Sequence, residues 1–270
     1  MIQVNPEKCS RCAACVKDCI VNLIQLPEDE GVPFVSPGEE KYCIHCGHCL
    51  AVCPTGALVC DGKSAEDCEP LGAIPKSDEM IHLIRQRRSI RQWSKRPIDD
   101  EILDQLKKIL DWTPTGCNAH NLQFIIIDSA AKMDLLRASV YGKLRSRAAN
   151  ILCRLFYPKF SRFLDLIMNG QDIVFRDAPA MIFALVPKNA PCTGFDPVIA
   201  LTHFDLCAQS FGLGTCWCGF AQSIFERVPG MKKLLDVPTG YRVGAVMLFG
   251  WPGVEYHRCT KPEAFEKGGR

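Results

Sequence analysis

The sequence predicts an α+β fold in two parts, a small cysteine-rich N-terminal domain and a larger domain of helices and strands. Two observations support this division. Residues 1–60 contain two copies of one cysteine pattern, and from residue 78 onward helical patterns are interspersed with short apolar runs. Residues 61–77 are polar and contain proline and glycine, which is typical of a linker. We therefore expect domains at 1–60 and 78–270.

Each copy of the cysteine pattern has the spacing C-x2-C-x2-C-x3-C, and the interval between counterparts is constant along the two copies. The spacing suits an iron–sulfur cluster, because three thiolates lie on one tight loop and a fourth follows at a distance. We predict that all eight cysteines are iron ligands: Cys9, Cys12, Cys15, Cys19, Cys43, Cys46, Cys49 and Cys53. Cys60 and Cys68 fall outside the spacing and are interpreted as plain thiols.

Zinc and disulfides are the alternative uses of so many cysteines. Structural zinc takes four ligands from two pairs, which leaves no use for the third cysteine of each run. A disulfide framework is not favoured, because the N-terminus does not resemble a secretion signal. His45 and His48 lie inside the second run, but with four cysteines present they are interpreted as surface or sulfur-facing residues.

The cysteine runs resemble those of bacterial two-cluster ferredoxins over residues 1–60. In that family the fourth cysteine of each run ligates the other cluster. The resemblance implies two 4Fe-4S clusters, one held by Cys9, Cys12, Cys15 and Cys53 and the other by Cys43, Cys46, Cys49 and Cys19. One departure is that Ile20 stands where the second run has Pro54.

The larger part begins with helical patterns. Ser77 and the acidic residues after it indicate a helix start, and a second helix follows Pro97. We expect strands at 124–128, 180–186 and 241–249, and further helices at 198–211 and 224–235. Residues 151–168 are amphipathic, which would suit a membrane surface. The interpretation that we favour is a lid or partner-facing helix over an active site.

An arginine cluster, Arg87-Arg88-Ser89-Ile90-Arg91, separates the first two helices. Guanidinium groups and a hydroxyl can together surround a phosphate. Judged by its charge alone, such a cluster more often forms a solvent-exposed surface than a binding site. Its sequence context favours the phosphate, because Pro114-Thr115-Gly116-Cys117-Asn118 follows after one helix and leads into a strand.

This order of motifs resembles the FMN-dependent nitroreductase family over about residues 78–270. The resemblance implies a central, mainly antiparallel sheet flanked by helices, and an intertwined homodimer with flavin at the subunit interface. It assigns the FMN phosphate and ribityl chain to Arg87, Arg88, Ser89 and Arg91, and a further phosphate contact to Arg258. Pro114, Thr115 and Gly116 are expected near the flavin of the other subunit, with Asn118 beside them, and Trp217, Cys218 and Gly219 against the flavin ring.

Other classes of protein are less well supported. Lys and Arg number 32 against 30 Asp and Glu, so no global charge indicates nucleic acid. No apolar run approaches the roughly 18–20 residues of a membrane span. Gly212-Leu213-Gly214 follows a helix and lacks the spacing of a Rossmann fingerprint. Oxygen-sensitive clusters and unpaired thiols favour a cytoplasmic location.

The predicted function combines an electron-transfer domain and a flavin reaction centre in one chain. Two 4Fe-4S clusters would pass electrons to FMN. Ferredoxin or NAD(P)H is the expected donor, and a nitro compound, a quinone or an activated double bond is the expected acceptor. No catalytic acid or base is assigned, because the cofactor carries the chemistry. Two alternatives remain open: a redox sensor without a dedicated substrate, and an electron carrier within a larger complex.

Overall fold

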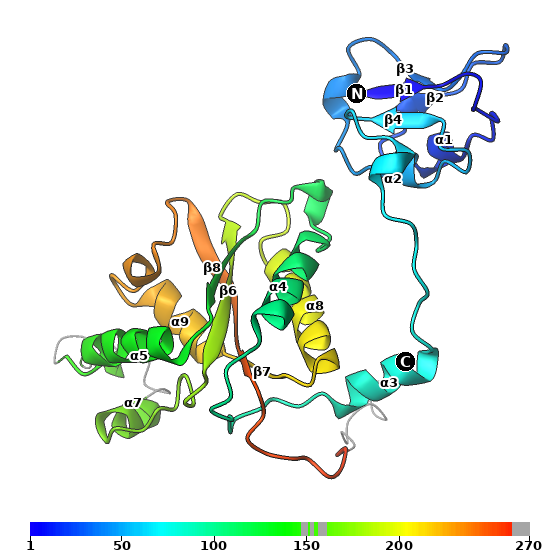
Figure 1. Cartoon of the computed structure of the whole chain (residues 1–270). Helices are drawn as coiled ribbons and strands as arrows, with labels where there is room; N and C mark the ends of the chain where they lie inside the picture. Colours follow the sequence, from blue (N-terminus) through cyan, green and yellow to red (C-terminus); the bar gives the residue numbers. More distant parts are fainter. Residues whose placement is uncertain (147–150, 152–153, 156–160, 261–270) are drawn as a thin grey trace, which may run out of the picture. The chain divides into compact units, whose positions relative to one another are not determined.

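The computed structural model describes residues 1–146, 151, 154–155 and 161–260. These residues form two compact units (Figure 1). The first unit comprises Met1–Ile74 together with Cys117–Ala119, and the second comprises Pro75–Gly116 and the residues from His120 onward. Each unit has its own hydrophobic core.

The first unit is a small α+β unit in which the sequence duplication is visible. Its strands form two antiparallel pairs, β1 (Ile2–Val4) with β4 (Leu58–Cys60) and β2 (Ile24–Gln25) with β3 (Phe34–Val35). Its helical segments are α1 (Ala14–Asp18), η1 (Glu40–Tyr42), α2 (His48–Ala51) and η2 (Ala65–Asp67). Helices α1 and α2 each begin directly before the third cysteine of their run. The two halves therefore repeat the same local structure.

The second unit is built on one four-stranded sheet with the order β5-β6-β8-β7, in which every pairing is antiparallel. The strands are β5 (Gln123–Ile127), β6 (Ala180–Pro187), β7 (Gly214–Trp217) and β8 (Tyr241–Gly250). Strands β6 and β8 form the long central pair, so they are buried on both faces. This architecture confirms the predicted antiparallel sheet flanked by helices.

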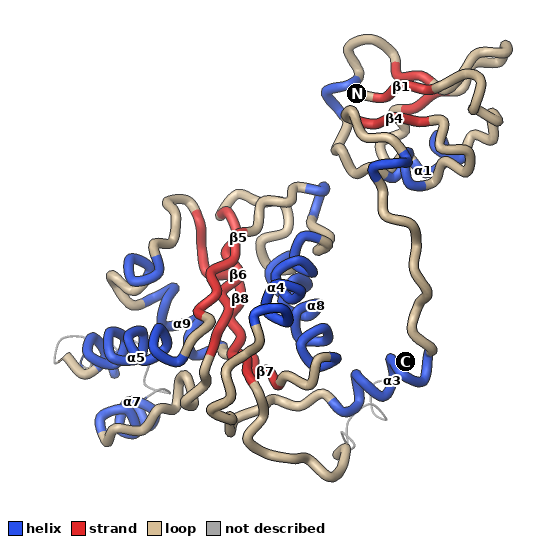
Figure 2. The backbone as a smooth tube through the Cα atoms, in the orientation of Figure 1, coloured by secondary structure: helices blue, strands red, loops and turns tan. Residues whose placement is uncertain are grey.

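Helices cover both faces of this sheet (Figures 1 and 2). Side chains alternate along β6. Phe183 belongs to the core beneath α5 (Ala130–Leu144) and α9 (Gly219–Arg227), whereas Ile182 belongs to the core beneath α4 (Asp100–Asp111) and α8 (Asp196–Ser210). The period-2 alternation explains how one strand supplies two cores. The helical segments from residue 75 onward are α3 (Ser77–Gln86), α4 (Asp100–Asp111), η3 (Gly116–Asn118), α5 (Ala130–Leu144), α7 (Ser161–Met168), α8 (Asp196–Ser210), α9 (Gly219–Arg227) and η5 (Lys232–Leu235).

The predicted helix at 224–235 is wrong, because α9 ends at Arg227 and a separate turn η5 begins at Lys232. Val228 is extended, as expected for a residue before proline, and Gly230 has a positive φ of 76°. Of the proposed lid at 151–168, residues 152–153 and 156–160 lie outside the described residues.

The described end of that segment, α7, has its apolar face buried in the second unit. Leu164 and Ile167 are 6% and 4% exposed. No helix in the described part of the chain combines the length and the apolar character that crossing a bilayer requires.

Candidate cofactor sites

Two cavities in the first unit are lined by the cysteines of the repeated runs. The first is lined by Cys9, Cys12, Cys15 and Cys53, among other residues. The second is lined by Cys43, Cys46, Cys49 and Cys19, together with a ninth cysteine, Cys60. Each cavity thus receives three cysteines from one run and the last cysteine of the other, which is the grouping that the ferredoxin resemblance implies.

The loops that carry these cysteines turn sharply through left-handed backbone conformations. Arg11 and Ala13 have φ values of 54° and 58° in the first run, and His45 and Gly47 have values of 53° and 69° in the second. Non-glycine residues adopt this region rarely and at an energetic cost. These left-handed residues curve each loop around its cavity. The residues present therefore fit a compact group held by several thiolates.

No three His, Cys, Asp or Glu side chains in the described residues converge tightly enough to hold a single metal ion. A 4Fe-4S core differs from one ion, because it spreads its four thiolates around a cube of atoms. The two histidines of the second run are engaged with carboxylates. His45 Nδ1 lies 2.7 Å from Asp61 Oδ2, and His48 Nδ1 lies 3.1 Å from Asp18 Oδ2.

In the second unit, the segment after α3 runs beside β7. Ser89 and Thr215 form a parallel bridge, and the Ile90 N–H donates to the Thr215 carbonyl at 2.8 Å. A Cβ at position 214 would lie 2.3 Å from Ile90 Cγ1. Gly214 therefore allows the arginine-rich segment to approach the strand closely.

A buried carboxylate links these two segments to helix α8. Asp205 is 3% exposed, and its Oδ1 accepts a hydrogen bond from the Thr215 hydroxyl. Its Oδ2 lies 3.7 Å from Arg87 Nη1. That Nη1 atom is itself buried and has no hydrogen-bond acceptor among the described residues. A buried guanidinium donor without an acceptor is costly unless a further anion binds there.

A cavity of about 480 Å³ lies beside this network. Arg88 and Arg258, which are far apart in the sequence, both line it. Gln209 of α8 and Thr215 of β7 form part of its wall. Within the second unit, the structure thus brings together two of the arginines predicted to contact phosphate.

Four polar or cationic residues converge on the Cys216 thiol. Burial raises the pKa of Cys216, whereas the charges of Arg176, Arg91 and Arg87 and a hydrogen bond with Ser89 lower it. Three of these residues were predicted as FMN contacts, but Arg176 was not. The sequence showed Arg176 only as part of a turn before a strand, so its proximity to the arginine cluster became visible only in the folded chain.

The loop that carries Arg176 is held by a network around Asp172. Its carboxylate accepts hydrogen bonds from the Tyr141 hydroxyl, from Arg137 Nε at 3.0 Å and from the Phe175 N–H at 2.9 Å. Arg176 has a left-handed φ of 54°. The network fixes a strained turn, which presents a cation beside β7.

The segment from Trp217 to Gly219 joins β7 to helix α9. Trp217 is 37% exposed, whereas Cys218 is 5% exposed and its thiol donates to the Val174 carbonyl at 3.2 Å. Burial raises the pKa of Cys218 to about 11. The Cys218 N–H donates to the Val246 carbonyl at 2.9 Å, so this group is already engaged within the protein.

The predicted loop after α4 is fixed by another buried carboxylate. The Gly116 N–H donates to Asp196 Oδ1 at 3.1 Å, and Asp196 is 1% exposed. A Cβ at Gly116 would lie 2.5 Å from Cys192 Sγ, so a larger residue would displace the loop. The Thr115 hydroxyl accepts from the His120 N–H at 2.9 Å. Pro114 directly precedes Thr115 and Gly116 in the sequence. Asn118 belongs to the first unit.

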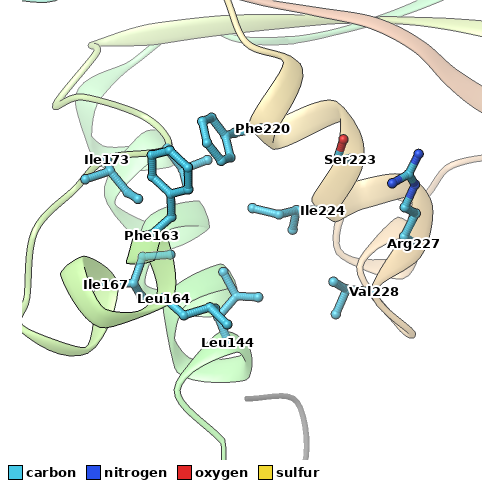
Figure 3. Close-up of a pocket in the computed structure, with 11 residues that line it drawn as sticks. Leu144, Phe163, Leu164, Ile167, Ile173, Phe220, Ser223, Ile224, Arg227 and Val228 are labelled. Carbon is cyan, nitrogen blue, oxygen red and sulfur yellow. The ribbon is translucent and has the colours of Figure 1, made fainter. Parts of the chain in front are cut away.

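An apolar cavity of about 80 Å³ lies between α7 and α9 (Figure 3). Phe163 and Phe220 meet edge to face there, with ring centroids 4.7 Å apart. Ser223 and Arg227 are the polar residues of its lining. No pattern in the sequence indicated this cavity.

The fold and these sites define an α+β protein with a thiolate-rich unit and an arginine-rich unit. Residues 84–251 match the nitroreductase family, and residues 8–58 match the 4Fe-4S dicluster domain. Because the first match spans more than half of the chain, the protein belongs to the nitroreductase family. This confirms the family resemblance for both parts of the sequence.

Individual relatives are distant. A protein from Archaeoglobus fulgidus provisionally named NADH dehydrogenase/NAD(P)H nitroreductase is 24% identical over 65% of this chain and 86% of its own length. The 5,6-dimethylbenzimidazole synthase of Rhodospirillum rubrum is 26% identical over 66% of this chain and 84% of its own. These two relatives carry different names, so the family does not identify the substrate.

Solved structures show the same fold. The FMN-bound nitroreductase of Bacteroides fragilis aligns with a TM-score of 0.56 and 19% identity, covering 70% of this chain and 96% of that one. An FMN-dependent nitroreductase of Clostridium difficile aligns with a TM-score of 0.53 and 21% identity, covering 72% of this chain and 100% of that one.

The Asp205 network predicts a specific loss of stability. Replacing Thr215 with valine removes the hydroxyl donor and leaves a buried carboxylate oxygen unpaired, which should lower the free energy of unfolding by about 1.5–3 kcal/mol. All four tryptophans lie in the second unit, so denaturant unfolding followed by tryptophan fluorescence reports on it.

Thr202→Val is the matched control. Thr202 is exposed on α8, and its hydroxyl bonds to the Val198 carbonyl within the same helix. This change should alter stability by less than about 0.5 kcal/mol. Equal effects of the two substitutions would contradict the importance of the buried network.

Proposed function

We propose that the protein is an FMN-dependent oxidoreductase whose N-terminal unit holds two 4Fe-4S clusters that supply electrons for reduction of an organic acceptor. The observation that carries this proposal is the buried Nη1 of Arg87. It is a cationic donor without a hydrogen-bond acceptor among the described residues, and the neighbouring Arg88 lines a cavity together with Arg258. A phosphate group can accept a hydrogen bond from this guanidinium and balance its charge.

Within this proposal, Arg87, Arg88, Ser89, Arg91 and Arg258 bind the phosphate and ribityl chain. Ser89 and Arg91 are placed by the pairing of their segment with Thr215 on β7. The phosphate would satisfy Arg87 on the side that Asp205 leaves open. The cavity of about 480 Å³ is within the size range of sites for small molecules and cofactors.

The isoalloxazine ring would lie against the turn from β7 into α9. Flavin chemistry consists of accepting electrons and delivering them to a substrate, and the protein binds the ring and tunes it. The Cys218 N–H is already hydrogen-bonded to the Val246 carbonyl, so the neighbouring Trp217 and Gly219 supply the other contacts of this turn with the flavin ring. Arg176 adds a positive charge that favours the reduced, anionic ring.

The Pro114, Thr115 and Gly116 loop and Asn118 are proposed to approach the flavin of a second subunit. This requires a homodimer. Helix α3 has no buried residue, and it exposes Ile81 by 48% and Ile84 by 53%. An exposed apolar helix face of this kind is well suited to burial against a second copy of the chain.

The eight cysteines lining the two cavities are proposed as the ligands of the clusters. The physiological donor is proposed to be ferredoxin or NAD(P)H, and the acceptor a nitro compound, a quinone or an activated double bond. The two clusters would deliver electrons one at a time, and FMN can store two electrons. A thiolate-rich unit fused to a flavin-binding fold suits this transfer.

Loss of the Arg87 side chain tests the flavin site. Arg87→Ala should weaken FMN binding roughly ten- to hundredfold, because one charge-assisted contact to the phosphate is lost. Binding is measured by quenching of FMN fluorescence during titration of the flavin-free protein. Arg85→Ala, an exposed arginine in the last turn of α3, is the control and should bind FMN as the parent does. An unchanged dissociation constant in Arg87→Ala would refute the assignment.

Loss of one cluster tests the electron path. In anaerobically prepared protein, Cys53→Ala should lose one of two clusters, retain FMN, and show slower flavin reduction by reduced ferredoxin in stopped-flow absorbance. Cys68→Ala, an exposed thiol outside the ligand spacing, is the control. Flavin reduction and acceptor turnover that are unaffected by Cys53→Ala would exclude the path, and reduced flavin that no acceptor reoxidises would favour a sensor.

The apolar face of α3 predicts the effect of a charge on assembly. Ile84→Asp should shift the protein from dimer to monomer, because burying a carboxylate in an apolar contact is costly. Light scattering coupled to gel filtration measures the mass. Leu135→Asp on α5, where leucine is 71% exposed, is the control. A dimer that is equally stable in both variants would place the subunit contact elsewhere.

A further inference from the structure

Asn118, which belongs to the first unit, is hydrogen-bonded to a cysteine loop of that unit. Its side-chain Nδ2 donates to the Ile44 carbonyl at 3.2 Å and to the His45 carbonyl at 2.9 Å. These two residues lie between Cys43 and Cys46, the first two cysteines of the second run. A carboxamide nitrogen carries two hydrogens, so each can serve one of the carbonyls.

The contact with Ile44 fixes a peptide group that faces a predicted ligand sulfur. The bond between Ile44 and His45 is trans, so the Ile44 carbonyl and the His45 N–H point in opposite directions within one plane. The carbonyl accepts from Asn118 on one side, and the N–H donates to Cys43 Sγ at 3.4 Å on the other. Rotation of this peptide would break both hydrogen bonds together.

The backbone of this loop needs such support. His45 has a left-handed φ of 53°, which non-glycine residues adopt rarely and at an energetic cost. The His45 ring contacts Asp61, but that contact acts on the side chain. The two hydrogen bonds from Asn118 act on the backbone itself and therefore support the strained conformation directly.

The corresponding loop of the first run is supported in another way. The counterpart of His45 is Arg11, which also has a left-handed φ. The Arg11 guanidinium donates to the Gly31 carbonyl at 2.5 Å and to the Pro27 carbonyl at 3.0 Å. These partners lie within the ferredoxin-like part of the chain, whereas Asn118 lies outside the duplicated sequence. The duplication therefore does not account for the support of the second loop.

The backbone at position 118 suits asparagine. Cys117 and Asn118 have left-handed φ values of 53° and 54°. Asparagine is among the residues that tolerate this region best. It thus supplies both the backbone conformation of its own loop and the donor for the cysteine loop.

We propose that Asn118 is a positioning residue for the cluster of the second cavity, because it fixes the peptide whose N–H donates to Cys43 Sγ. A donor to ligand sulfur stabilises the more negative, reduced cluster and so raises its reduction potential. The inference rests on the proposed function, since it requires a cluster in that cavity. This role is additional to the place of Asn118 in the loop that is proposed to approach the flavin.

The test compares Asn118→Gly, Asn118→Gln and the parent protein. Glycine adopts a left-handed φ without a steric penalty, so Asn118→Gly removes the donor without straining the loop. Asn118→Gln retains a carboxamide donor. Cys117→Ser, at an exposed neighbour in the same loop, is the control.

All variants are purified anaerobically, and their iron, sulfide and FMN contents are measured. Each is then titrated electrochemically while the reduced clusters are followed by electron paramagnetic resonance. Cys53 lines the first cavity, so Cys53→Ala should keep only the cluster of the second cavity and identify its signal. The readout is the pair of midpoint potentials, which does not depend on turnover.

Asn118→Gly should retain FMN and both clusters. The one-electron equilibrium of the second cavity's cluster should shift toward the oxidised form roughly three- to tenfold, as expected for loss of one hydrogen bond. Its midpoint potential becomes more negative, and that of the other cluster stays unchanged. Asn118→Gln should recover part of the shift, and Cys117→Ser should match the parent.

Unchanged potentials in Asn118→Gly would overturn the inference, and so would a shift of both clusters or loss of a cluster. Equal shifts in Asn118→Gly and Asn118→Gln would also contradict it, because the donor would then not be the cause. A parent protein without two clusters would instead refute the proposed function itself.

Discussion

The buried carboxylate of Asp205 is the interaction on which the second unit's candidate site depends. It joins helix α8 to the strand that carries Thr215 and to the segment that carries Arg87. A carboxylate that is 3% exposed is tolerated only when donors surround it. Because Arg87 gives it only a long contact, one guanidinium nitrogen is left for an external anion. The same carboxylate therefore stabilises the fold and leaves a donor of Arg87 free to bind an anion.

The cysteines illustrate how position, rather than residue type, determines chemistry. Those of the two runs line cavities on strained loops, where thiolates can face a cluster. Cys216 and Cys218 are buried in the apolar core of the second unit, where burial raises their pKa and suppresses thiolate reactivity. Cys60 is intermediate, because it is buried and yet lines the same cavity as four cysteines of the two runs.

Part of the fold could be predicted from local patterns alone. The apolar run at 180–186 is buried over its whole length, as a central strand requires, and helix α8 ends near the glycine that has a left-handed φ at position 212. The helix prediction at 224–235 failed because an apolar pattern continues across Val228 and Pro229, where the backbone cannot remain helical. Tertiary packing buries both pieces despite the break.

The sequence by itself determined the family, the two-part organisation of the cysteine spacing, and the residue types suited to iron and phosphate. These properties depend on order and spacing along the chain, which local patterns capture. Only the tertiary structure decided that Arg176 joins the arginine cluster, that Asp205 leaves Arg87 partly unpaired, and that Cys60 lines one cavity with Cys19. Each of these relations joins residues that are well separated along the chain, and the distance between such residues is set by packing of strands and helices rather than by neighbouring sequence.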